Sequence, residues 1–174
     1  LMGETAERLA DQYGISRDEQ DAYALRSQQR AAVAQTEGRF DAQIVPVEVR
    51  QGRAVTTLAK DEHPRADTTI DGLRKLPRVF RKTDGTVTAG NASGITDGAA
   101  ALLVCSEAEL SRLKVQPVAR ILGVARAGVD PKVMGIGPVP ATRRLLAELN
   151  LSLEDFDLVE LNEAFAAQVI ACDR

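Results

Sequence analysis

The chain has 174 residues, enough for one full domain or two small ones, and its 44% hydrophobic content is ordinary for a globular protein. Aromatic residues make up only 3%, so the core must be built largely from Ala, Val, Leu and Ile. The net charge of -3 argues against a nucleic-acid surface, no apolar stretch approaches the roughly 18 residues that span a bilayer, and the first residues lack a signal-peptide pattern.

The first third of the chain is predicted to be helical. An apolar face at helical spacing precedes Gly14 and is formed by Ala6, Leu9, Ala10 and Tyr13. Gly14 is expected to end this helix. Residues 16–19 form a capping-box pattern that opens a second, longer helix ending near Gly38.

A short strand is predicted at residues 44–49, where Pro46 favours an edge position because proline cannot donate to a sheet. Residues 50–82 are rich in turns and charges and have weak periodicity. We therefore expect a long functional excursion there rather than a part of the core.

From Thr86 onward, strands and helices are expected to alternate. Apolar runs predict four strands, at residues 86–89, 98–104, 118–129 and 156–161. Helices are predicted from Ser106 to Leu113, from about Pro140 to Asn150, and from Ala167 onward. This alternation is typical of an α/β fold.

Few side chains could carry chemistry alone. Cys105 continues the apolar run that begins at Gly98 and is expected to be a small core residue, while Cys172 is too distant in sequence to form a CxxC pattern with it. His63, the only histidine, stands in a polar loop and is predicted to have a structural or surface role.

Two segments show stronger signs of a site. Asn162 follows the predicted strand 156–161, and an open α/β sheet presents ligand-binding groups at the carboxyl ends of its strands. The alternative is that Asn162 only caps the next helix. Residues 90–94 are small, so that a ligand could lie on the backbone and bond the Ser93 hydroxyl; the alternative there is a tight turn.

Together, the strings Asn162–Ala166 and Thr86–Ala100 resemble the thiolase family, the acyl-CoA acetyltransferases that make or cleave 3-oxoacyl-CoA thioesters. The resemblance covers essentially the whole chain. It implies an α/β fold that is part of the layered αβαβα thiolase fold, with a helical and irregular loop domain. The implied division is a coenzyme-A-binding loop domain at 1–95, the end of the N-terminal α/β half at 96–116, and the beginning of the C-terminal half at 117–174.

The resemblance also implies roles for single residues. Asn162 would be catalytic, because the corresponding Asn of thiolases holds a water that, with a His from elsewhere, stabilises the thioester enolate. The residues implied to contact coenzyme A or the acyl group are Met2, Arg65, Ala89, Ser93, Met134, Ala164 and Phe165. Two departures stand out: Leu1 where thiolases commonly have His, and Gly72 where many have Ser.

A basic run in the excursion allows two interpretations. It consists of Arg74, Lys75, Arg78, Arg81 and Lys82. Such a run usually forms a solvated face. The resemblance offers the alternative that part of it, with Arg65, lies near the phosphates of coenzyme A, which attract Arg and Lys.

Thiolases also need a nucleophilic Cys, a His that activates it and a second Cys, each in a recognisable string, and none of the three strings occurs in this sequence. We expect a thiolase-type acyltransferase whose nucleophile and bases lie outside these residues. The alternative is a catalytically incomplete chain that binds coenzyme A or a partner subunit. The resemblance further implies coenzyme A as a substrate, with no permanently bound cofactor and no metal. It also implies a homodimer or homotetramer that binds neither nucleic acid nor a membrane, and a cytoplasmic location. Residues 133–140 look more like degradative thiolases, including those that cleave 3-oxoadipyl-CoA.

Overall fold

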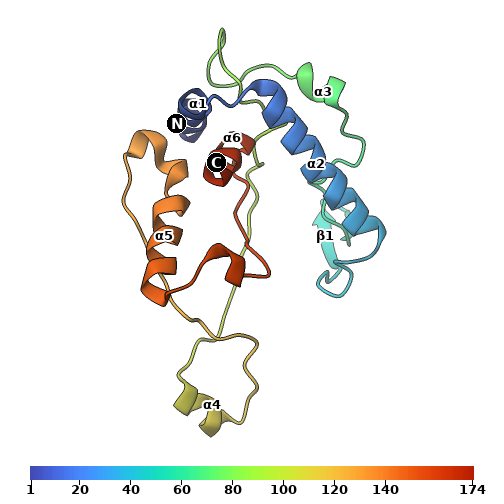
Figure 1. The fold of residues 1–174 in the computed structure, drawn as a ribbon. Helices are drawn as coiled ribbons and strands as arrows, with labels where there is room; N and C mark the ends of the chain where they lie inside the picture. Colours follow the sequence, from blue (N-terminus) through green and yellow to red (C-terminus); the bar gives the residue numbers. More distant parts are fainter.

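The computed structural model describes all residues, 1–174 (Figure 1). Its helices are α1 (Met2–Tyr13), α2 (Arg17–Thr36), α3 (Ile70–Arg74), α4 (Glu107–Leu113), α5 (Pro138–Leu149) and α6 (Ala166–Asp173). Two short 3₁₀ helices, η1 (Pro131–Ile136) and η2 (Leu153–Asp155), and two strands, β1 (Val47–Gln51) and β2 (Ala54–Leu58), complete the regular structure. None of the helices combines the length and apolar character needed to cross a lipid bilayer.

The core lies where the first and last helices meet. Figure 1 shows α6 between α1 and α2, so the two ends of the chain lie close together. The buried cluster joins side chains of α1 and α6 with Ile15, which lies between α1 and α2, and its members are Leu9, Ala10, Ile15, Ala167 and Ala171. Small alanines on α6 let the helices approach closely. This helix pair is the frame on which the neighbouring loops rest.

The predicted ends of the first two helices are confirmed. Gly14 follows α1 with a φ of 61°, a left-handed conformation that glycine adopts without strain. The Ser16 hydroxyl accepts a hydrogen bond from the Glu19 amide at the start of α2. Helix α2 ends at Thr36, close to the predicted Gly38.

The predicted strand at 44–49 begins three residues later, at Val47, and belongs to a hairpin. Strand β1 pairs antiparallel with β2, with Val47 opposite Leu58 and Gln51 opposite Ala54. Pro46 precedes the strand instead of lying in it. Every residue of both strands is exposed, so the hairpin projects from the helices rather than joining a core.

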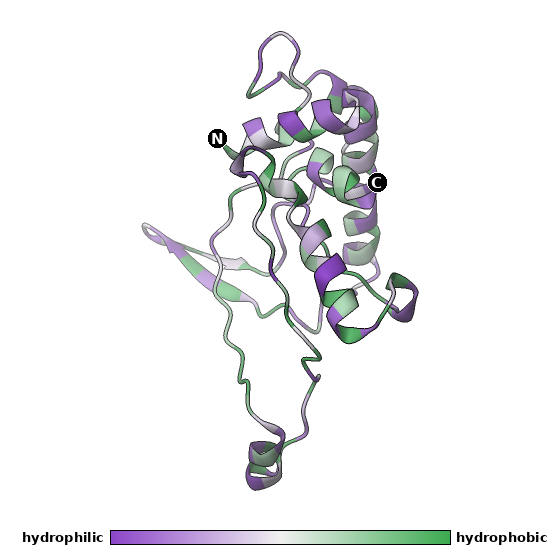
Figure 2. Ribbon diagram, turned by 60° about the vertical axis from the view of Figure 1, so that its left-hand side comes forward, coloured by the Kyte–Doolittle hydropathy of each residue, from purple (hydrophilic) through white to green (hydrophobic).

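The other four predicted strands are absent. Residues 86–89, 98–104, 118–129 and 156–161 are extended but have no strand partner. A β-strand needs a neighbour for its backbone groups, and none of these segments has one within the 174 residues. The last three are also exposed: Leu102 and Val124 have 85% and 80% of their surface accessible. Figure 2 shows two of them as long, largely apolar arms leading to and from α4.

The prediction that Cys105 is a core residue is therefore wrong in this chain, because the arm that carries it is exposed. The helices around the arms form as predicted. The Ser106 hydroxyl caps α4, and Asn150 ends α5 in a left-handed conformation with a φ of 52°. These helix ends are set by neighbouring residues, whereas the arms depend on a distant partner.

Candidate functional site

The two strings that predicted a site lie side by side. The Ser93 amide donates to the Ala164 carbonyl at 3.0 Å, and the Ala166 amide donates to the Asn91 carbonyl at 2.9 Å. Between these bonds, Ala92 and Phe165 form an isolated antiparallel bridge. The loop 90–94 and the segment 162–166 are thus one backbone unit, although about 70 residues separate them in the sequence.

Asn162 does not cap the last helix. The N-cap of α6 is Phe165, and no side chain caps that helix. The Asn162 amide instead lines a cavity of about 220 Å³. The alternative interpretation from the sequence is therefore wrong, and Asn162 is exposed where it lines this cavity.

This smaller cavity gathers most of the residues predicted to contact an acyl group. It is lined from four parts of the chain: Met2, Thr5, Ala6 and Leu9; Met134, Gly135 and Pro138; Leu161, Asn162, Ala164 and Phe165; and Gln168. Most of these side chains are apolar. A short apolar chain can therefore lie here, with the Asn162 amide as a polar group at its side.

Two close contacts fix residues around the smaller cavity: Phe80 packs on Phe165, which lines the cavity, and Gly135 lines it directly. The Phe80 ring meets the Phe165 ring edge to face, with 6.5 Å between their centroids. It also lies over Gly3, where an added Cβ would come within 2.0 Å of the ring. At Gly135, an added Cβ would lie 2.8 Å from Gln168 Cγ and 2.9 Å from Leu9 Cδ1. Only glycine allows either approach.

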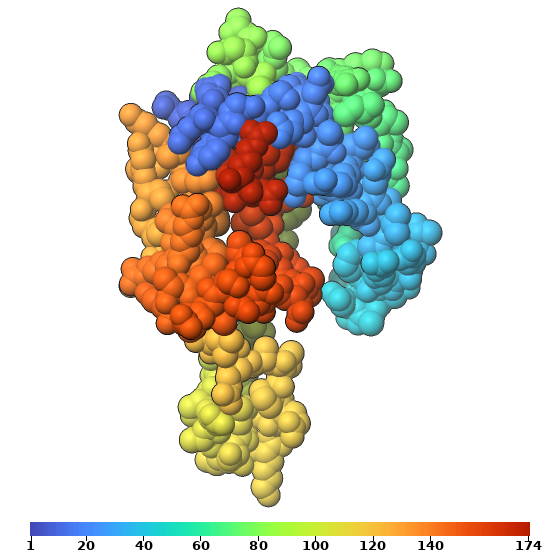
Figure 3. All heavy atoms as spheres, viewed as in Figure 1, coloured from blue at the N-terminus to red at the C-terminus, as the bar shows by residue number.

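A larger cavity of about 810 Å³ lies on the other side of the joined strings. Its lining comes from α2, from residues 58–64, from the loop 90–97 and from Glu163. Figure 3 shows an opening between the light-blue and cyan part of the chain and its orange-red part. Ser93 lines this cavity, and its amide rather than its hydroxyl makes the bond that fixes the loop.

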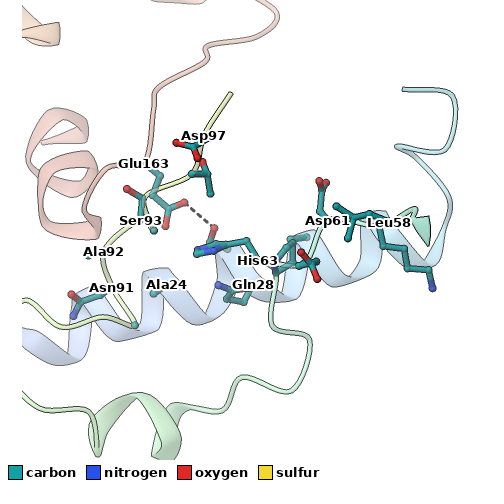
Figure 4. Close-up of a pocket in the computed structure, with 18 residues that line it drawn as sticks. Ala24, Gln28, Leu58, Asp61, His63, Asn91, Ala92, Ser93, Asp97 and Glu163 are labelled. Carbon is teal, nitrogen blue, oxygen red and sulfur yellow. Dashed lines mark hydrogen bonds between the residues drawn. The ribbon is translucent and has the colours of Figure 1, made fainter. Parts of the chain in front are cut away.

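The charged groups of the larger cavity are mostly acidic (Figure 4). Glu163 faces α2 and accepts a hydrogen bond from the Ser27 hydroxyl at 2.8 Å. The imidazole of His63 lies against Gly94, where a Cβ would come within 2.1 Å of His63 Cε1. Carboxylates outnumber cations here, since Asp61, Glu62, Asp97 and Glu163 face only Lys60 and His63. A neutral ligand suits this cavity better than a phosphate does.

Two predicted contact residues lie apart from both cavities. Ala89 is exposed at the start of the loop and lines neither of them. Arg65 is exposed beside Pro64, which does line the larger cavity, and the Arg65 amide donates to Gln28. The structure thus brings together Met2, Met134, Asn162, Ala164 and Phe165 around one cavity and places Ser93 at the other.

Part of the basic run is held by carboxylates of the helices. Arg74 pairs with Asp18, and Arg81 pairs with Asp11 at 2.6 Å. The hydrogen bond to Asp11 raises the pKa of Arg81. These two guanidinium groups attach the excursion to α1 and α2, a role that differs from both the solvated face and the phosphate contact.

Sequence reasoning missed several residues of the smaller cavity. Thr5, Ala6 and Leu9 share a face of α1 with Met2, and Gln168 lies one turn after Ala164. Helical spacing from the residues already proposed could have found them, because residues three or four apart share a face. Gln168 is buried, and its Oε1 has no hydrogen-bond partner.

Comparison with known proteins agrees with this geometry. The family described as "Thiolase, N-terminal domain" matches residues 1–108, and "Thiolase, C-terminal domain" matches residues 115–174. The chain belongs to the thiolase family. The match accounts for the extended arms and confirms a partial thiolase fold. The finer division at residues 95 and 116 stays a prediction.

Individual thiolases match at about half identity. A "Beta-ketoadipyl-CoA thiolase" from Pseudomonas aeruginosa is 53% identical over 173 residues, which are 99% of this chain and 43% of that protein. The mitochondrial "3-ketoacyl-CoA thiolase" of Bos taurus is 51% identical, also over 43% of its length. The chain spans less than half the length of the relatives it matches.

Solved structures give the same result. The Bacillus anthracis acetyl-CoA acetyltransferase has a TM-score of 0.92 at 54% identity, over 99% of this chain and 44% of that one. Human mitochondrial 3-ketoacyl-CoA thiolase, solved in complex with CoA, has a TM-score of 0.89 at 51% identity, over 99% of this chain and 42% of that one. The fold around both cavities is therefore a thiolase fold.

Proposed function

We propose that this chain is the middle part of a thiolase that transfers an acyl group between a 3-oxoacyl-CoA and coenzyme A. The observation that carries the proposal is the convergence of Asn162 with Met2, Met134 and Phe165 around one apolar cavity. The loop that joins this cavity to the larger one carries Ser93. A thioester could thus lie with its acyl chain in the smaller cavity and its pantetheine arm along the loop.

In this proposal Asn162 acts on developing charge. Claisen chemistry passes through an enolate of the thioester, and a fixed amide donor, directly or through a held water, stabilises its oxygen. The other side chains around the cavity are mostly apolar, so few groups compete for the Asn162 amide. Met2, Met134 and Phe165 place the acyl chain, and Ser93 bonds the pantetheine amides.

The neutral pantetheine arm suits the acidic larger cavity, whereas the phosphates of coenzyme A do not. We place the phosphates outside it, near Arg65 and the cations of the excursion that have no carboxylate partner. The human relative solved in complex with CoA supports coenzyme A as the ligand.

The same proposal includes a homodimer or homotetramer and a cytoplasmic location. Light scattering of the complete protein tests the number of subunits.

The nucleophile and the bases would come from residues outside these 174. Neither cavity is lined by a cysteine. The exposed arms at 98–104 and 118–129 have no strand partner here, and in this proposal residues outside the 174 pair with them. The relatives are more than twice as long as the matched segment, which leaves room for both. Covalent catalysis needs nucleophile and base within hydrogen-bond reach, so this chain alone should not catalyse.

A chimera tests the proposal directly. These 174 residues replace the matching segment of the Pseudomonas aeruginosa relative, which supplies the rest of a thiolase. We expect coenzyme-A-dependent cleavage of a 3-oxoacyl-CoA by the chimera and none by the 174 residues alone. A folded chimera that binds coenzyme A without cleaving would instead favour the alternative, a chain that binds coenzyme A but does not catalyse.

Within this proposal, the acyl group of the substrate is a separate question. The names of the relatives point to 3-oxoadipyl-CoA or to 3-oxoacyl-CoA thioesters more generally. The 220 Å³ cavity is apolar apart from Thr5, Asn162 and Gln168. Comparing kcat/KM of the chimera for acetoacetyl-CoA and 3-oxoadipyl-CoA decides between a short neutral chain and an acidic one.

A further inference from the structure

Two buried carboxylates lie outside both cavities. Glu7 on α1 and Asp21 on α2 have none of their surface accessible, and neither lines the smaller or the larger cavity. A buried carboxylate is costly unless charge-assisted hydrogen bonds compensate for its desolvation. Both have such bonds, and in both cases the bonds lead to the segment 86–91.

Glu7 holds the beginning of this segment. Its two oxygens accept hydrogen bonds from the Thr86 amide at 2.8 and 3.0 Å, from the Thr86 hydroxyl at 2.8 Å and from the Val87 amide at 3.0 Å. The carboxylate thus replaces the strand neighbour that these amides lack. This is why residues 86–89 are buried in part and extended, yet form no strand.

Asp21 holds the other end through Asn91. Its Oδ1 accepts from Asn91 Nδ2 at 2.9 Å, and its Oδ2 accepts from Arg17 Nε at 2.6 Å. Asn91 Nδ2 also donates to the Thr86 carbonyl, and Asn91 Oδ1 accepts from the Thr88 amide at 2.8 Å. The carboxylate therefore fixes the orientation of the Asn91 amide, which closes the turn from both sides.

The fixed turn leads directly to both cavities. The Asn91 carbonyl accepts from the Ala166 amide, and Ser93 is two residues further along the loop. We propose that Glu7 and Asp21 are positioning residues that set the Ser93 loop and, through it, the Asn162 segment, without touching a ligand. This inference rests on the proposed function for its effect on catalysis, but not for its effect on the loop.

The rival explanation is that the two carboxylates only stabilise the fold. Both explanations predict a lower melting temperature when either carboxylate is removed, so stability alone cannot separate them. The local order of the loop and the kinetic constants can separate the two explanations. The isosteric variants Asp21→Asn and Glu7→Gln remove the charge and keep the volume, and Asp18→Asn is the matched control, since Asp18 is an exposed ion-pair partner on the same helix.

The experiment measures amide hydrogen exchange and steady-state kinetics of the chimera. In Asp21→Asn, exchange at residues 88–93 and 166 should rise about tenfold, as expected from one weakened buried hydrogen bond, while α5 stays unchanged. The value of kcat/KM should fall about 10- to 100-fold, because small misplacements of binding groups are costly. Glu7→Gln should act most strongly at residues 86 and 87, and Asp18→Asn should change neither measurement.

A second variant distinguishes a local effect on the loop from a general loss of folding. Adding Asn91→Asp to Asp21→Asn restores one carboxylate and one amide at this contact, and part of the loop protection should return. Uniformly raised exchange across the chain, or a lowered melting temperature with unchanged kcat/KM, would overturn the positioning role. An inactive but folded parent chimera would contradict the proposed function alone, because the exchange measurement would still decide whether Glu7 and Asp21 set the loop.

Discussion

The Asn162 amide is the polar side chain on which the proposed chemistry depends most. It is not used as a helix cap, and the cavity that it lines is otherwise nearly apolar. In the chimera, Asn162→Ala should lower kcat by about 10²–10³-fold, the loss typical of an oxyanion donor, with little change in KM. Steady-state thiolysis kinetics measure both constants.

Asn150 offers the matched control for that variant. It ends α5 in a left-handed conformation and lines neither cavity, and Asn150→Gly keeps that backbone conformation accessible. A rise in KM with kcat unchanged in Asn162→Ala would assign Asn162 to binding rather than to the enolate.

Variants of Ser93 test whether the loop contacts coenzyme A. Ser93→Leu should weaken coenzyme A binding at least tenfold, because a large side chain would project into the larger cavity beside Gly94, while the melting temperature should change little at this exposed position. Ser93→Ala keeps the space and removes the hydroxyl, so it separates steric blocking from a lost hydrogen bond. Calorimetric titration beside a thermal melt of each chimera variant gives the two quantities. Unchanged affinity with a lowered melting temperature would end the assignment of Ser93 to the ligand.

At the scale of elements, the approach of η1 to α1 and α6 depends on Gly135. A Cβ there would come within 3 Å of both Leu9 and Gln168, which are buried and cannot move freely. Gly135→Ala should therefore destabilise the chimera by about 1–3 kcal/mol, the usual cost of overpacking. It should also raise KM for the acyl substrate, because Met134 would move with the backbone.

The control is Gly128→Ala on the nearby arm. Nothing lies within 4 Å of a Cβ at Gly128 in these 174 residues. The two variants are therefore also compared in the isolated chain, where Gly128→Ala should keep the parent's melting temperature and Gly135→Ala should lower it. Equal stability of the two variants would show that η1 can shift away at no cost.

The helices were predictable from sequence because their ends are local. Ser16, Ser106 and Asn150 act on amides or carbonyls within a few residues, and the structure uses each of them as expected. The strands failed for the opposite reason. A run such as 98–104 becomes a strand only beside a partner, and the sequence pattern contains no information about where that partner lies.

The candidate site shows the same division. Met2, Met134 and Phe165 were proposed from resemblance, and the fold gathers them around one cavity. Glu7 and Asp21 were not anticipated, because a carboxylate on an amphipathic helix looks like a solvated one until the segment that it binds is placed. Their partners lie 70 to 80 residues away.

At the scale of the whole molecule, the two cysteines distinguish the isolated chain from a completed thiolase. Cys105 is exposed on its arm, whereas Cys172 is partly buried and burial raises the pKa of its thiol. In the isolated chain an alkylating reagent should therefore modify Cys105 first, since the thiolate is the reactive form. In the chimera, strand partners should cover the arm and protect Cys105.

Mass spectrometry of both proteins at successive labelling times measures this difference. Cys172 serves as the internal reference, because its contacts with Gln168 and the Gly135 carbonyl lie within the core shared by both proteins. Equal labelling of Cys105 in the two proteins would contradict the proposal that the arm receives strand partners.

The packing of α6 against α1 also has a consequence during synthesis. Helix α1 has 12 residues, too few to be stable by itself in water, and its buried face meets the alanines of a helix that begins at residue 166. At about 5–20 residues per second, a ribosome needs roughly 8–30 seconds to make the intervening residues. During that interval the apolar face of α1 must remain uncovered or be shielded by a chaperone, although Glu7 can already bind Thr86 and Val87 once these residues have been made. Both cavities therefore assemble only after the Asn162 segment and α6 have left the ribosome.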